Sequence, residues 1–129
     1  MNKREIRALV EDAKLCSRQN ESGSKQARIG RMDPENLDLF YTAYDTITSP
    51  LRQRLNSLSA DDLTIFSSLC YVQRDEDKSW AEAMLDARAG VNPDKEDHVN
   101  YLVGFCRIIA TLLDPGTRAQ REITIRFQD

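Results

Sequence analysis

The chain reads ADDLTIFSSLCYVQ at residues 60–73, where apolar side chains recur over a wide arc of a helix. The apolar members are Leu63, Ile65, Phe66, Leu69, Cys70 and Val72. Because recurrence every three or four residues is typical of an α-helix, the pattern predicts a largely buried helix. Its start resembles a capping box, with Ser59 before the run and Asp62 in place of the usual Glu.

Three other helix starts carry a side-chain acceptor followed by proline, the pairs Asp33-Pro34, Ser49-Pro50 and Asn92-Pro93. Together with the apolar periodicity, these signals predict helices at about residues 3–20, 34–48, 50–58, 60–73, 78–89 and 93–113. Residues 21–32 hold two glycines and few apolar side chains, and we expect them to form a loop. The helix at 93–113 is expected at the centre of the fold.

The last residues follow a different pattern, since Ile123, Ile125 and Phe127 alternate with polar residues. A period of two is typical of a strand. A lone strand has no partner inside a helical domain, so this segment is disordered, packed irregularly, or paired across an oligomer interface. The predicted fold is all-α, a compact bundle of five or six helices over residues 1–116 with a flexible or strand-like C-terminal tail at 117–129.

The composition excludes some classes of protein. With 129 residues, 40% hydrophobic and 30% charged, the chain is neither a disordered polar tail nor a membrane protein. The net charge of −3 is too acidic for a nucleic-acid binder that uses its whole surface. The N-terminal segment is nevertheless basic, and its patch comprises Lys3, Arg4, Arg7, Lys14 and Arg18. These charges either complement the acidic middle of the chain or contact an acidic partner or nucleic acid.

Three widely spaced cysteines, Cys16, Cys70 and Cys106, each lie in an apolar stretch. Such free thiols fit a reducing, cytoplasmic location better than a disulfide framework. His98 is the only histidine, so we expect neither a zinc site nor another cofactor. No signal-peptide pattern or bilayer-spanning apolar run is found.

The common catalytic motifs are missing, and no catalytic residue is predicted. His98 is interpreted as a partly exposed residue on a helix surface, and the acidic run at 75–77 as a solvated turn. One polar stripe stands out along the predicted helix at 93–113, because Asn100, Gly104 and Arg107 recur at helical spacing. Gly104 allows either close approach of another helix or a groove in which Arg107 binds a carboxylate or phosphate. The candidate interaction groove therefore comprises Arg74, Asp75, Asn100, Gly104 and Arg107.

Three segments suggest a family: LCYVQRD at 69–75, SWAEA at 79–83, and YLVG at 101–104 before Pro115-Gly116. This order, over residues 50–116, resembles a small bacterial family classed as a domain of unknown function. In that family an aromatic-x-Gly-Arg-Gly-Asp turn precedes a tryptophan-bearing helix, whereas Gln73 and Glu76 stand here where the glycines are expected. The resemblance implies a helical fold and no particular activity.

The sequence favours a non-enzymatic bacterial protein that acts through protein–protein contact, most simply as a homo-oligomer. One alternative is nucleic-acid binding through the basic N-terminal patch. The other is a small-ligand or metal-dependent enzyme near the turn at Arg74 and Asp75.

Overall fold

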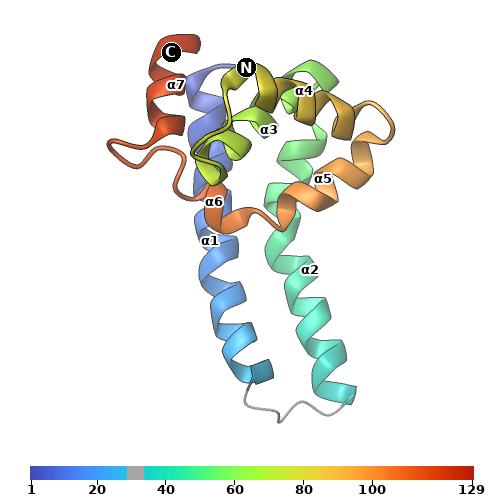
Figure 1. Ribbon diagram of the computed structural model, residues 1–129. Helices are drawn as coiled ribbons and strands as arrows, with labels where there is room; N and C mark the ends of the chain where they lie inside the picture. The colour runs from blue at the N-terminus through green and yellow to red at the C-terminus, as the bar shows by residue number, and fades with distance from the viewer. Residues whose placement is uncertain (29–33) are drawn as a thin grey trace.

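The computed structural model describes residues 1–28 and 34–129, and all of its regular elements in these ranges are helices, as predicted (Figure 1). Seven helices occur in the described ranges, more than the five or six expected: α1 (Lys3–Arg28), α2 (Pro34–Asn56), α3 (Ala60–Arg74), α4 (Trp80–Val91), α5 (Lys95–Val103), α6 (Cys106–Ile109) and α7 (Arg118–Arg126).

Helices α1 and α2 run antiparallel, and their far ends project beyond all the other helices (Figure 1). We call residues 17–28 of α1 and 34–46 of α2 the arm, and the remainder of the described chain the head. The head holds the core, which α1 enters through five fully buried side chains, those of Ile6, Leu9, Val10, Ala13 and Cys16. Among the helices of residues 1–28 and 34–129, none combines the length and the apolar composition that a bilayer-spanning segment needs.

Helix α3 confirms the prediction made from residues 60–73. Ser59 caps its first turn by accepting a hydrogen bond from the backbone N–H of Asp62 at 3.1 Å. Phe66 and Leu69 are fully buried, and the buried hydroxyl of Ser67 donates to the carbonyl of Leu63 at 2.7 Å. This bond lets a polar side chain enter the core without an unsatisfied donor.

The loop predicted at 21–32 is wrong over residues 21–28, because α1 continues to Arg28. Lys25, Gln26, Ala27 and Arg28 favour helix, and a single internal glycine costs only about 1 kcal/mol relative to alanine. The rest of the predicted loop lies outside the described residues.

The two helices predicted at 34–48 and 50–58 form one helix, α2, with Pro50 inside it. Proline removes one backbone hydrogen bond from a helix. Packing outweighs this loss, because Leu51 and Leu55 are fully buried while Pro50 is exposed.

The long central helix predicted at 93–113 is also wrong. It divides into α5 and the short α6, and Gly104 lies at the break as the C-cap of α5. The glycine therefore ends a helix instead of occupying a helix interior. After the break, Cys106, Ile109 and Leu112 all enter the core.

The C-terminal tail is a helix, α7, and the strand-like prediction is wrong. Ala119, Ile123 and Phe127 recur every four residues and are buried in the same core as α1. The period of two at 123–127 arises because Ile125 lies on the opposite, exposed side of α7. The spacing of four residues between Ala119, Ile123 and Phe127 therefore accounts for which side chains of α7 are buried, whereas a strand-like alternation would also bury Ile125.

Candidate functional site

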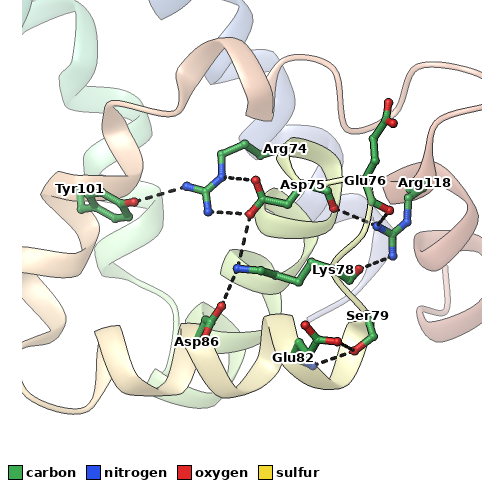
Figure 2. Close-up of polar contacts among 9 residues, drawn as sticks. All are labelled: Arg74, Asp75, Glu76, Lys78, Ser79, Glu82, Asp86, Tyr101 and Arg118. Atoms are coloured by element: carbon green, nitrogen blue, oxygen red, sulfur yellow. Dashed lines mark hydrogen bonds and ion pairs between the residues drawn. The ribbon is translucent and has the colours of Figure 1, made fainter.

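The turn between α3 and α4 gathers a set of paired charged side chains, with ion pairs that join Arg74, Asp75, Lys78 and Asp86 (Figure 2). Arg74, the last residue of α3, donates two parallel hydrogen bonds to the carboxylate of Asp75. Its Nε lies 3.1 Å from Oδ1 and its Nη2 lies 2.9 Å from Oδ2. This two-point geometry orients both groups more strictly than a single ion pair does.

The guanidinium of Arg74 also lies over aromatic rings. Its Cζ is 5.1 Å from the ring centre of Tyr71 and 5.2 Å from that of Phe105. Its Nη1 approaches the hydroxyl of Tyr101 at 3.5 Å (Figure 2). Arg74 therefore joins the end of α3 to the α5–α6 segment by cation–π contacts as well as by charge.

Lys78 links the turn to α4. Its Nζ lies 3.4 Å from Oδ2 of Asp75 and 2.5 Å from Oδ2 of Asp86, and it sits 5.5 Å from the ring centre of Tyr71. Burial raises the pKa of Tyr71 to about 12, so its phenol stays protonated near neutral pH.

The chemistry of the turn follows from this pairing. Hydrogen bonds from Arg74 hold the pKa of Asp75 below its ordinary value. The hydrogen-bonded ion pair between Lys78 and Asp86 raises the pKa of Lys78. Asp75 is therefore a carboxylate near neutral pH and a poor proton donor. Arg74, Asp75 and Lys78 contact one another and residues of the neighbouring helices. These contacts hold the end of α3 against α4 and against the α5–α6 segment.

Arg118 of α7 clamps the same turn from the other side (Figure 2). Its guanidinium donates to three backbone carbonyls, those of Asp75 at 3.0 Å, Glu76 at 2.7 Å and Lys78 at 2.6 Å. The sequence analysis missed this residue, because it assigned the segment to a strand-like tail. The signal that could have found it is the capping box Thr117-x-x-Gln120, in which Thr117 Oγ1 accepts from the N–H of Gln120 at 3.2 Å.

The candidate interaction groove is only partly assembled. Arg74 and Asp75 are paired, but Asn100 of α5 accepts instead from Nε of Arg52 on α2, at 3.1 Å. Gly104 is exposed at the helix break, and Arg107 is exposed on α6. The prediction that Asn100, Gly104 and Arg107 share one helix face assumed a continuous helix. Because α5 ends before Gly104 and α6 begins at Cys106, the three residues do not lie on one helix.

The basic patch lies on α1, where Arg4, Arg7 and Arg18 are exposed. Several of its charges are partly balanced within the chain. Lys3 and Arg7 lie 3.9 and 3.8 Å from a carboxylate oxygen of Asp129, and Lys14 lies 3.4 Å from Glu11.

His98 is buried, so its prediction as a partly exposed residue is wrong. Its Nε2 lies 2.9 Å from the hydroxyl oxygen of Ser67. Because that hydroxyl already donates to Leu63, the ring nitrogen acts as the donor to Ser67. Burial lowers the pKa of His98, and the neutral ring is favoured.

A shallow depression of about 410 Å³ lies beside the Arg118 clamp. It is lined by Val72, Gln73, Glu76, Gly116, Thr117, Arg118 and Arg121. Gln73 is committed to the fold there, since its Oε1 accepts from the N–H of Ala119 at 3.3 Å and its Nε2 donates to Thr111 Oγ1 at 3.0 Å. Arg118 is likewise engaged with backbone carbonyls.

Within residues 1–28 and 34–129, no three His, Cys, Asp or Glu side chains gather in a way that could hold a metal ion. In comparisons with known proteins, no family model, no curated protein and no solved structure matches the chain. The resemblance to a bacterial domain family stays a prediction.

Proposed function

We propose that this protein is a non-enzymatic interaction module and that its first partner is a second copy of the same chain. The arm is the observation that carries the proposal. Two long helices extend past the head, beyond the part of the fold that buries the core (Figure 1). A projecting pair of helices offers an extended surface to a partner, and contact there does not require the core residues of the head to move.

Exposed apolar surface on α2 supports the arm as the contact element. Tyr41 is 60% exposed, whereas Leu51 and Leu55 of the same helix are fully buried in the head. Positions 41, 44, 48, 51 and 55 follow one another at spacings of three or four, and all except Thr48 carry a large tyrosine or leucine side chain, so this face of α2 runs from the head into the arm. A second copy can cover the part that the head does not.

Charge supports a second copy in particular. Residues 17–28 of α1 contain three basic residues and one acidic residue, and residues 34–46 of α2 contain three acidic residues and no basic one. Two arms placed side by side with two-fold symmetry can bring α1 of each copy against α2 of the other. Such a contact would bring the basic segment of each copy beside the acidic segment of the other.

Sedimentation velocity over a range of protein concentrations tests the proposal. We expect a dimer for the full chain, and we expect Tyr41→Ser and Arg18→Glu to shift it toward the monomer. The matched controls are Leu85→Ser and Arg88→Glu, which change an exposed apolar and an exposed basic residue on α4 of the head. A full chain that stays monomeric throughout, or control variants that dissociate as readily as arm variants, would contradict the proposal.

Nucleic-acid binding is a second candidate, supported by the spacing of the basic patch. Lys3, Arg7, Lys14 and Arg18 follow at intervals of four, seven and four, which places them on one face of α1. Fluorescence anisotropy with a labelled duplex at low salt tests it. Binding should weaken steeply with salt and be lost in Arg7→Glu and Arg18→Glu, but not in Arg88→Glu. No anisotropy change at low salt would end this candidate.

We further propose a cytoplasmic location. It is supported by Cys16, Cys70 and Cys106, whose thiols are buried and form no disulfide.

A further inference from the structure

Two of the three cysteines lie against each other where the arm leaves the head. Cys16 is fully buried on α1, and Cys106 begins the short helix α6, with 5% of its surface exposed. Their side chains are hydrogen-bonded, although they are 90 positions apart in the sequence.

We propose that Cys16 and Cys106 form a reversible disulfide when the protein meets a peroxide, joining α1 to α6 at the base of the arm. Hydrogen-bonded thiols are already close, and the helices that carry them pack on each other in the core. Disulfide formation needs two cysteines whose side chains face each other over a short distance. The inference does not depend on the proposed self-association.

The reaction balances with hydrogen peroxide as the oxidant. The Cys106 sulfur, the more accessible of the two, attacks one peroxide oxygen, so the O–O bond breaks and a sulfenic acid and water form. The Cys16 sulfur then attacks the Cys106 sulfur, the S–O bond breaks, and the hydroxyl leaves as a second water with the Cys16 proton. Two thiols lose two electrons in all, and one peroxide becomes two waters.

Burial of the two thiols makes the formation of the disulfide slow. Burial, together with the neighbouring Cys106, raises the pKa of Cys16 to about 12, so little of this thiol is deprotonated near neutral pH and it reacts slowly. Cys106 directly follows the break at Gly104 and Phe105 and keeps 5% of its surface exposed, so peroxide reaches this sulfur first. We therefore expect slow oxidation in the native state and a strong effect once the bond has formed.

Treatment of the dilute full-length protein with hydrogen peroxide, followed by mass spectrometry without reductant, tests the proposal. We expect the intact mass to fall by two hydrogen atoms and one cross-linked peptide pair to contain Cys16 and Cys106. The melting temperature should rise by roughly 10 °C, because the bond closes a loop of about 90 residues. Dithiothreitol should reverse both changes.

Cysteine variants provide matched controls. Cys70→Ser removes the third buried thiol and should keep the cross-link, whereas Cys106→Ser should lose it and leave the melting temperature unchanged by peroxide. The wild-type peptide map alone decides the matter if a variant does not fold. Separate sulfinic acids at Cys16 and Cys106, a link through Cys70, or thiols that react only after unfolding would overturn the proposal.

Discussion

Gly90 and His98 share a small space between α4 and α5. A Cβ atom at position 90 would lie 2.6 Å from Nδ1 of His98 and 2.7 Å from its Cε1, closer than side chains can approach. Glycine is therefore needed at this helical position because a ring occupies the adjacent volume. The ring is held in turn by its hydrogen bond with Ser67.

We predict that Gly90→Ala destabilises the protein by about 1–3 kcal/mol, because the buried ring must move and its bond to Ser67 is lost. Helix propensity alone predicts the opposite sign, a gain of about 1 kcal/mol. Urea unfolding measures the difference. In a His98→Ala background the ring is absent, and the cost of Gly90→Ala should disappear; an equal cost in both backgrounds would contradict this account.

His98 also predicts a pH dependence. Burial lowers its pKa in the folded state, so the unfolded chain binds a proton more readily than the folded one. The stability that neutral His98 contributes is fully present above about pH 6.5, and it is lost as the pH falls through the lowered folded pKa.

Denaturant unfolding between pH 8 and about pH 5 should show this loss. Because His98 is the only histidine, His98→Gln should flatten the curve over that range. A wild-type curve that is already flat there would count against a buried neutral ring.

At the scale of elements, α7 is joined to the rest of the fold by polar as well as apolar contacts. Arg118 holds the carbonyls of Asp75, Glu76 and Lys78, and Arg126 lies 4.4 Å from the ring centre of Trp80. The start and end of α7 thus contact the turn and the first residue of α4. This arrangement fixes the direction in which α4 leaves α3.

We predict that Arg118→Ala destabilises the protein by about 1–3 kcal/mol, because three backbone acceptors lose their donor. Arg118→Lys should recover only part of this, since an ammonium lacks the planar fork of a guanidinium. The control is Arg121→Ala, an exposed residue of the same helix, which should change stability by less than about 0.5 kcal/mol. Thermal unfolding followed by circular dichroism compares the three variants, and equal losses for Arg118→Ala and Arg121→Ala would refute the clamp.

At the scale of the whole molecule, the two chain ends are part of one head. The backbone N–H of Lys3 donates to the carbonyl of Gln128 at 2.9 Å, and the terminal ammonium of Met1 lies 3.3 Å from Asp62. Ile6, Ile123 and Phe127 belong to the same core. The last thirteen residues are therefore needed for the fold.

We predict that truncation after Gly116 leaves the protein largely unfolded. Ile123 and Phe127 alone contribute about 1.5–3 kcal/mol each by burial, and the Arg118 clamp is lost with them. A chain ending at Phe127 is the control, because it loses only the contacts of Gln128 and Asp129. A truncated chain with the melting temperature of the control would show that α7 is dispensable.

Local signals predicted the helical class and the start of α3 correctly. Ser59 and Asp62 cap that helix, and its apolar residues lie in the core as their spacing predicts. Of the candidate groove, the sequence could place Arg74 and Asp75 together because they are adjacent in the chain. It could not place Tyr101, Phe105 or Arg118 around them, because such contacts depend on how distant helices pack.

The sequence by itself determined which segments bury an apolar face, because that depends on side chains only three or four positions apart. Only the tertiary structure decided where a helix continues or breaks, as at Pro50 and Gly104, and that the final segment forms α7. At those places local preferences differ by about 1–3 kcal/mol, and burial of several side chains in a shared core is large enough to outweigh them.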